Sequence, residues 1–538
     1  MNELPDLAGQ DLCQLSAAMD AGAITSVQLV DAFLARIAAH DKQGAGVNAL
    51  TALLPDAREQ ALRRDRERAA GHVRGALHGL PIVVKDNIDV SGLPTTAGCA
   101  ALLDHRPARD AEVVRRLREA GAVVLGKANM SEMACSNGRY GYSSLAGLTL
   151  NPWNLGRNAA GSSSGSAAAV AAGFAPAALG TDSFGSVRAP ACVTGLVGLR
   201  PTHGLVPLDG VLPLALSFDT VGPMTRGVRD AAMLLDVMAD ARPGAGDGDG
   251  GCTAALRAGI DAARDVRIGV LVDYPGQDDE VRAVLQDAQA MLRELGATLV
   301  PLALPAPPAD ALDARPDASL PGAATAAGSA YLHTLYPGLL APLAEAEWPA
   351  QLDAYLAAGV GGGPRDMARL VAAAQAWSAA HPDREVNPRT LAGMRRALDQ
   401  ARTRTAAQRA RSEDALAAYR AAIVQCFQDG RLDALLFPTL SCPASPRYDR
   451  PDPDYVVHPG NAYAGLYVAS AAGLPEISVP AGMARAGVPI GLSFMGAPHG
   501  EAGLLRLAHA FEQARGFRAD GARAAFPDSS ADPGPARA

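Results

Sequence analysis

Hydrophobic residues in the first third of the chain recur at two spacings, one helical and one extended. Residues 27–39 carry apolar side chains at intervals of three and four, which places them on one helix face. Residues 79–85 form a continuous apolar run with proline near its start, typical of a buried strand. An amphipathic stretch over residues 111–120 then precedes Gly121 and the apolar residues 122–125. This succession predicts helices and strands that alternate in an α/β fold.

The same two patterns return in the second half of the chain. A strand followed by a loop is predicted over residues 177–188. Further strands are predicted over residues 266–272, 432–438, 476–479 and 490–495, and helices over residues 281–295 and 504–511. Residues 305–430 are rich in Ala, Pro and Arg, and we expect a mainly helical insert there. The glycine-rich residues 243–251 predict a loop, and the polar tail 520–538 is expected to be disordered. We expect one domain over residues 1–538.

Composition and charge exclude several classes of function. The chain has 538 residues, a net charge of −8, 49% hydrophobic and 19% charged residues, which indicates a folded protein. The negative charge argues against nucleic-acid and anionic-membrane binders. We find neither a secretory signal nor a membrane-spanning segment, and the seven scattered cysteines fit reduced thiols, so a cytoplasmic location is expected.

Lysine is unusually rare in this sequence. Only three of the 48 basic residues are lysines, namely Lys42, Lys85 and Lys127, and the rest are arginines. A lysine can lose its proton when it is buried, whereas an arginine keeps its charge. A lysine in this sequence could therefore serve where an arginine cannot. Lys85 lies at the end of an apolar strand, where burial is expected, while Lys42 is expected to be an exposed loop charge and Lys127 to have a structural role.

A serine cluster offers a candidate nucleophile. Gly161-Ser-Ser-Ser-Gly165 matches the G-x-S-x-G pattern of a nucleophile elbow with Ser163 at its centre, but that motif requires a preceding strand. The preceding residues 151–158 are turn formers, so the serines could instead cap the N-terminus of the following helix. Because P-loop, H-E-x-x-H and paired-cysteine patterns are absent, we expect neither a metal nor an organic cofactor.

Three segments carry a more specific signal when they are read together. They are Leu80-Pro-Ile-Val-Val-Lys-Asp-Asn87, Asn158-Ala-Ala-Gly-Ser-Ser-Ser-Gly-Ser166 and Leu179-Gly-Thr-Asp-Ser-Phe-Gly-Ser-Val-Arg-Ala-Pro190. In order and separation they resemble the lysine strand, the Gly/Ser signature and the nucleophile loop of the amidase signature family. The resemblance is dense over a signature core at residues 75–240 and looser over residues 430–515.

The resemblance implies a fold and a set of catalytic groups. The fold would be α/β/α layered, with a mixed, twisted central sheet covered by helices. The catalytic triad would be Ser186 as nucleophile, Ser162 after a cis peptide bond, and Lys85 as base. The backbone N–H groups of the nucleophile loop would form an oxyanion hole, contributed by Ser183, Phe184, Gly185 and Ser186. Supporting roles would fall to Ser163, Asp182 and Arg188.

Two departures and one further segment bear on the substrate site. Phe184 stands where the family pattern has a small residue, and Ser164 replaces a glycine of the signature. The Phe184 side chain could line the acyl pocket or pack into the core beside Val187. Cys135 and Ser136 resemble residues that line the family's substrate site, so they are candidate pocket residues.

These residues imply an amidohydrolase that cleaves a linear carboxamide to a carboxylate and ammonia or an amine through an acyl-serine. Two alternatives stay open, namely the glutaminase A-type subunit of a tRNA-dependent amidotransferase and an ester or carbamate hydrolase with the same triad. The expected partner is a small-molecule amide, with no nucleic acid and no membrane, and a homodimer is left open. Residues 305–430 could cover the substrate site.

Overall fold

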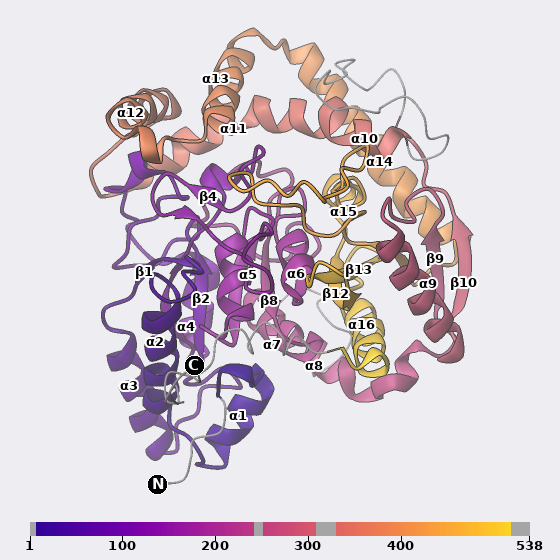
Figure 1. Cartoon of the computed structure of the whole chain (residues 1–538), viewed down its shortest axis with the longest axis horizontal. Coiled ribbons are helices and arrows are strands. Elements are labelled where there is room, and N and C mark those ends of the chain that lie inside the picture. The colour runs from indigo at the N-terminus through magenta and orange to yellow at the C-terminus, as the bar shows by residue number, and fades with distance from the viewer. Residues whose placement is uncertain (1–6, 241–250, 308–329, 518–538) are drawn as a thin grey trace, which may run out of the picture.

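The computed structural model describes residues 7–240, 251–307 and 330–517. Eleven strands form one sheet in the order β1-β3-β2-β6-β8-β7-β12-β13-β11-β9-β10, and helices cover it (Figure 1). The strands are β1 (Leu50–Leu53), β2 (Pro81–Lys85), β3 (Val123–Ala128), β6 (Ala177–Thr181), β7 (Val197–Arg200), β8 (Val221–Thr225), β9 (Arg267–Leu271), β10 (Thr298–Leu302), β11 (Ala434–Pro438), β12 (Glu476–Met483) and β13 (Pro489–Gly496). A separate two-stranded sheet pairs β4 (Tyr142–Ser143) with β5 (Gly147–Leu148).

The helices surround this sheet and extend above it. They are α1 (Leu12–Asp20), α2 (Ser26–His40), α3 (Ala57–Ala69), α4 (Glu112–Glu119), α5 (Ser164–Ala171), α6 (Arg188–Thr194), α7 (Val228–Met238), α8 (Gly251–Ala255), α9 (Asp279–Glu294), α10 (Ala330–Leu335), α11 (Ala341–Ala358), α12 (Met367–Ala380), α13 (Pro388–Thr403), α14 (Ala406–Gly430), α15 (Leu466–Ala472) and α16 (Glu501–Arg515). Shorter helical turns are η1 (Leu7–Gly9), η2 (Ala100–Leu102), η3 (Glu132–Ala134), η4 (Leu256–Ala263), η6 (Tyr336–Leu340) and η7 (Pro382–Arg384).

The sheet is mixed, as the resemblance implies. Strand β2 runs parallel to both of its neighbours, β3 and β6, and β9 runs parallel to β10 and β11. The strands between these two groups pair antiparallel. The α/β fold with a helix-covered mixed sheet is therefore confirmed.

Most of the predicted elements lie within one to four residues of the observed bounds, but the central strands β7 and β8 were not predicted. Both contain glycine, and β8 contains Pro223, two residue types that are depleted in strands. Gly222 has a structural reason to be there, because a β-carbon would lie within 3.0 Å of the Leu199 carbonyl oxygen on β7. The close approach of the two backbones thus requires glycine, and glycine is the residue type that kept the strand from being predicted.

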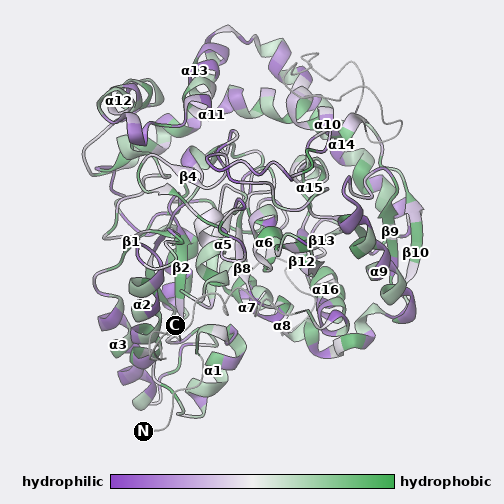
Figure 2. Ribbon diagram, in the orientation of Figure 1, coloured by the Kyte–Doolittle hydropathy of each residue, from purple (hydrophilic) through white to green (hydrophobic). Residues whose placement is uncertain are grey.

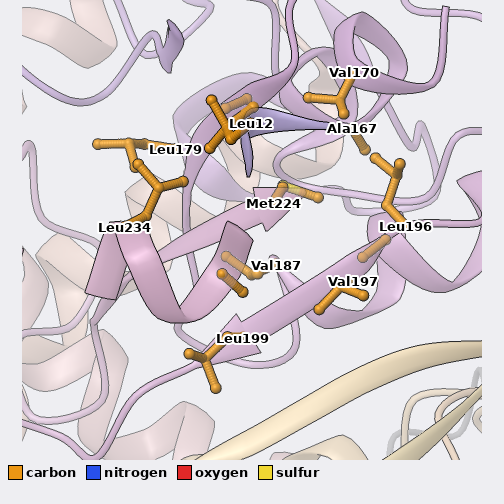
Figure 3. Packing of buried hydrophobic residues seen from close by; sticks show 14 of the residues in the cluster. Leu12, Ala167, Val170, Leu179, Val187, Leu196, Val197, Leu199, Met224 and Leu234 are labelled. Atoms are coloured by element: carbon orange, nitrogen blue, oxygen red, sulfur yellow. The ribbon is translucent and has the colours of Figure 1, made fainter. Parts of the chain in front are cut away.

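The core is built around small side chains. All eight residues of α5 are buried, five of them alanines or valine, so the helix packs closely on β6. Figure 3 shows Val187, Leu199 and Met224 among the buried side chains of the same hydrophobic cluster. Figure 2 shows β2 in hydrophobic green, whereas α3 and α13 carry hydrophilic patches.

The described part of residues 305–430 consists mainly of the helices α10 to α14, which arch over one end of the body (Figure 1). The tail predicted over residues 520–538 and most of the loop predicted over residues 243–251 lie outside the described residues. No helix in the described ranges is both long enough and apolar enough to cross a bilayer.

Candidate active site

Lys85 ends strand β2 inside the protein. Every residue of β2 is buried, and the parallel neighbours β3 and β6 flank it on both sides. The Lys85 Nζ lies 2.8 Å from Ser162 Oγ and donates to Thr181 Oγ1 at 2.7 Å and to the Thr181 carbonyl at 3.3 Å. Because Thr181 ends the adjacent strand β6, two parallel strand ends position the lysine beside Ser162.

The environment of Lys85 disfavours its charged form. Burial lowers the pKa of Lys85 to about 7, and the nearby Asp182 and Asp219 oppose that shift without cancelling it. No carboxylate forms an ion pair with Lys85 within the described residues. A neutral amine is therefore available near neutral pH.

Ser162 lies in a tight turn before α5. The Gly161-Ser162 peptide bond is cis, as the resemblance implies, and Ser162 is fully buried. Its carbonyl accepts a hydrogen bond from the Ser131 N–H at 3.0 Å. A β-carbon at Gly161 would lie within 3.0 Å of the hydroxyls of Ser131 and Ser136, so a larger residue would have to displace both hydroxyls.

Ser163 supports this turn through its neighbours. Its N–H donates to the Ser186 carbonyl at 3.2 Å, and its hydroxyl donates to the Thr181 carbonyl at 3.2 Å. The alternative in which the serines cap the helix through their side chains is wrong, because the α5 N-terminus has no side-chain cap. The Ser164 hydroxyl instead donates to the Ala160 carbonyl at 2.6 Å.

The loop before α6 presents Ser186. Ser186 is half-buried, and its hydroxyl makes no hydrogen bond within the part of the chain that the structure describes. Gly185 adopts φ 103°, and a β-carbon there would lie within 3.0 Å of Leu466 on α15. The loop thus needs glycine at this position for both its backbone conformation and its packing.

The four N–H groups predicted for an oxyanion hole differ in their hydrogen bonding. The Gly185 N–H donates to Asp182 Oδ1 at 2.9 Å. Among the described residues, the N–H groups of Ser183, Phe184 and Ser186 donate to no partner. Three donors at the nucleophile loop are therefore free to meet a developing negative charge.

A buried ion-pair network braces the loop from behind. Arg188 donates to both carboxylate oxygens of Asp182 at 2.8 and 3.0 Å and pairs with Glu476 on β12. Arg200 on β7 donates to Asp182 Oδ1 at 3.0 Å. Burial alone would raise the pKa of Asp182, but Arg188 and Arg200 hold it well below its usual range. These contacts place Asp182 and Arg188 behind the loop that carries Ser186.

Phe184 contacts the helical region as well as the body. It is half-buried, and its ring lies 5.3 Å from the Phe218 ring and 5.1 Å, edge to face, from the Tyr336 ring. Tyr336 in turn stacks on Tyr467 at 5.2 Å. An aromatic cluster thus joins the nucleophile loop, residues 336–340 and α15.

Cys135 and Ser136 lie close to the catalytic candidates. Burial raises the pKa of Cys135 to about 12, so its thiol stays protonated, while the nearby Lys85 charge opposes that shift. The Ser136 hydroxyl donates to Ser131 Oγ at 3.0 Å beside Gly161. Ser136 therefore borders the turn that holds Ser162, whereas Cys135 lies near enough to Lys85 for the two groups to interact electrostatically.

The other two lysines are engaged elsewhere. Lys127 is buried and pairs with Asp86 at 3.1 Å, a structural contact. The Lys42 side chain is 54% exposed and donates to the Leu50 carbonyl at 2.6 Å. Lys85 is thus the lysine that meets the serine cluster.

Sequence reasoning missed two polar residues that hold Lys85. Thr181 accepts two hydrogen bonds from the amine, and Asn87 donates to Thr181 Oγ1 at 3.1 Å. Both lie inside the segments that carry the family resemblance, at the ends of predicted strands. Their position at the ends of adjacent predicted strands was the feature of the sequence that could have indicated contact with Lys85.

Comparisons with known proteins identify the family of the chain. The family described as Amidase matches residues 28–505. The A-type subunit of a glutamyl-tRNA(Gln) amidotransferase from Symbiobacterium thermophilum is 46% identical over 290 residues, which is 53% of this chain and 58% of that relative. The chain therefore spans less than two thirds of the length of the curated relatives it matches.

Solved structures match over a greater length. A native peptide amidase from Stenotrophomonas maltophilia is 35% identical, with a TM-score of 0.81 over 96% of this chain and 98% of that chain. An amidase family protein from Bacillus anthracis is 29% identical, with a TM-score of 0.77 over 96% of this chain and 93% of that chain. The chain belongs to the amidase family.

Proposed function

We propose that the chain hydrolyses a linear carboxamide to a carboxylate and ammonia or an amine, with Ser186, Ser162 and Lys85 as catalytic residues. The observation that carries this proposal is the buried Lys85 amine, 2.8 Å from Ser162 Oγ, with its pKa lowered to about 7. A neutral amine can serve as a general base at neutral pH.

In the first step, neutral Lys85 accepts a proton from the Ser162 hydroxyl while Ser162 accepts the proton of Ser186. The Ser186 oxygen then bonds to the substrate carbonyl carbon. Substrate binding brings the two serine hydroxyls into hydrogen-bonding contact, since such contacts tighten in the Michaelis complex. The free N–H groups of Ser183, Phe184 and Ser186 stabilise the oxyanion that develops on the carbonyl oxygen.

In the second step, the carbon–nitrogen bond breaks as the proton on Lys85 returns through Ser162 to the leaving nitrogen. The acyl group remains on Ser186 as an ester. A water molecule then attacks this ester and gives its proton to the same relay. The carbon–oxygen bond to Ser186 breaks, the serine regains its proton, and the carboxylate leaves.

For the substrate class we propose a peptide amide. The supporting likeness is the peptide amidase, because it covers 96% of this chain and so includes the helices α10 to α14. The aromatic contact between Phe184 and Tyr336 adds support, since it brings the helical region against the nucleophile loop. Residues 305–430 would then help to bind the acyl side of the substrate.

A second candidate is the glutaminase component of a tRNA-dependent amidotransferase. It is favoured by the 46% identity to the Symbiobacterium amidotransferase chain over 290 residues. An ester or carbamate hydrolase would use the same three residues. These functions differ in substrate and partner and share the proposed triad.

The test is a panel of amidated peptides, simple aliphatic and aromatic amides, glutamine, and matched esters and carbamates. The isolated wild-type chain should hydrolyse amidated peptides without ATP, and Ser186→Ala should lose at least about 10³-fold in kcat. Ser16→Ala, at a half-buried serine on α1, is the matched control and should retain full activity.

Each competing outcome has a distinct signature. Activity on glutamine that appears only with partner subunits and charged tRNA would favour the amidotransferase component. Faster turnover of esters or carbamates than of amides would favour the ester or carbamate hydrolase. Full activity of Ser186→Ala on the best substrate would refute the proposed mechanism.

A further inference from the structure

A cavity lies between α1, α7 and α16, and none of the proposed triad residues lines it. It has a volume of about 590 Å³. Its walls carry the acidic residues Asp11, Asp230 and Glu512, together with Cys13 and His509. Three carboxylates and a thiol around one cavity are an arrangement that amide hydrolysis does not require.

Three of these side chains converge. One carboxylate oxygen of Asp11, the Cys13 Sγ and one carboxylate oxygen of Asp230 all lie within 4.8 Å of one another. Asp11 and Cys13 flank the start of α1, whereas Asp230 comes from the first turn of α7. The cluster thus links two helices that are more than 200 residues apart in sequence.

Asp230 is the most informative member of the cluster. It is buried, with 1% of its surface exposed, and its Oδ1 accepts a hydrogen bond from the Cys13 N–H at 3.2 Å. Its Oδ2 is buried and has no hydrogen-bond partner among the described residues. A buried, unpartnered carboxylate oxygen is costly, and a bound cation would satisfy it.

Both acidic and basic groups face the cavity. Arg226 and Arg229 line it together with the three acidic residues. A Glu512 carboxylate oxygen lies 3.1 Å from His509 Nδ1. Within the cluster itself the two carboxylates repel each other, and a bound cation would offset that repulsion.

We propose that Asp11, Cys13 and Asp230 bind one divalent transition-metal ion of the zinc class, which ties α1 to α7. A thiolate with two carboxylates suits this class better than calcium or magnesium, which take oxygen ligands only. In a tetrahedral site, zinc–sulfur and zinc–oxygen bonds of about 2.3 and 2.0–2.2 Å put ligand atoms roughly 3.3–3.7 Å apart. A closing movement of about 1 Å would therefore bring all three ligand atoms onto one ion.

The competing explanation is that Asp230 only anchors the start of α1 through the Cys13 N–H. In that case the Cys13 thiol serves only as a hydrogen-bond partner of Asp230, and replacing it would change no metal binding. The two explanations therefore separate at Cys13→Ser, which keeps the backbone donor and removes the soft ligand.

The test is equilibrium dialysis of the full chain against zinc, with cobalt as a spectroscopic probe. We expect wild type to bind one equivalent more zinc than Cys13→Ser, and cobalt to give a thiolate charge-transfer band that this variant lacks. Asp230→Asn should weaken zinc binding at least about tenfold. Cys426→Ser, at a half-buried cysteine on α14, is the matched control and should bind like wild type.

Amide hydrolysis by each variant reports whether it is folded, since none of these residues belongs to the proposed triad. Equal zinc stoichiometry and affinity in wild type and Cys13→Ser would overturn the proposal, as would the absence of the cobalt–thiolate band in wild type. Loss of zinc binding only in Asp230→Asn would leave the thiol without a role and equally overturn it.

Discussion

Lys85 combines two properties that a basic residue rarely has together, complete burial and no carboxylate partner within the described residues. Its neighbours are hydroxyl and carbonyl oxygens, which stabilise an amine without fixing its proton. Lys127, equally buried, pairs directly with Asp86 instead. A carboxylate partner, present at Lys127 and absent at Lys85 within the described ranges, thus distinguishes the structural lysine from the proposed base.

Replacing this amine with a guanidinium tests the role of Lys85. Lys85→Arg preserves the charge but cannot give up its proton, so we expect its kcat to fall roughly 10²- to 10⁴-fold, nearly as far as in Lys85→Ala. The measurement is steady-state turnover of the best amide. Lys42→Arg, at the exposed lysine, should stay at the wild-type rate, and near-normal turnover by Lys85→Arg would contradict a proton-transfer role.

The pH dependence follows from the same burial. The base works when neutral, and burial lowers the pKa of Lys85 to about 7, so kcat/KM should rise with pH through about 7 and then level off. Asp219 raises this pKa through its charge, and therefore Asp219→Asn should move the rising limb to lower pH. A pH–rate profile of both proteins checks this, and an unmoved or upward-shifted limb would argue against Lys85 as the titrating group.

At the scale of elements, helix α6 and strands β7 and β12 are joined by buried charges. Arg188→Met would leave Asp182 and Glu476 buried without their shared partner, and removal of one partner from such a network costs about 3–5 kcal/mol. Burial raises the pKa of Glu476 to about 7, so this carboxyl group is partly neutral at pH 7. Glu476→Gln should therefore lower the free energy of unfolding by less than Arg188→Met does.

Denaturant unfolding at pH 7 measures both losses. Arg58→Met, in the exposed pair with Asp31, is the control and should change the free energy of unfolding by less than about 1 kcal/mol. Equal effects of the buried and exposed substitutions would mean that the network contributes little to stability.

The pairing of β7 with β8 depends on one glycine. Gly222→Ala would push a methyl group against the Leu199 carbonyl, and we expect a loss of about 1–3 kcal/mol. In Gly393→Ala on α13 the new methyl group would meet only the Arg396 side chain, at 3.6 Å, so the variant should gain about 0.5–1 kcal/mol because alanine favours helix. Thermal unfolding of the two variants should therefore shift in opposite directions.

At the scale of the whole molecule, the sequence predicted what depends on local pattern. Strand β2 and helices α2, α4 and α16 followed from apolar spacing, because one face or all of each element is buried. Strands β7 and β8 did not, because close backbone contact selected glycine over typical strand residues. Tertiary contact overrode local propensity there.

The candidate site, like the fold, could be predicted only in part from the sequence. The positions of Lys85, Ser162 and Ser186 followed from the family resemblance, and the scarcity of lysine alone pointed only to three candidate lysines. The Thr181 contact and the meeting of Phe184 with Tyr336 could not be predicted, because they join segments that only the folded chain brings together.

The ion pair between Arg188 and Glu476 has a consequence for synthesis of the protein. The two residues are 288 positions apart, so a ribosome adding about 5–20 residues per second delivers Glu476 roughly 15–60 s after Arg188. During that interval the guanidinium has Asp182 nearby but lacks the strand that completes its burial. The loop that carries Ser186 therefore reaches its final setting only when β12 joins the sheet, so a nascent chain that has not yet reached β12 should remain inactive.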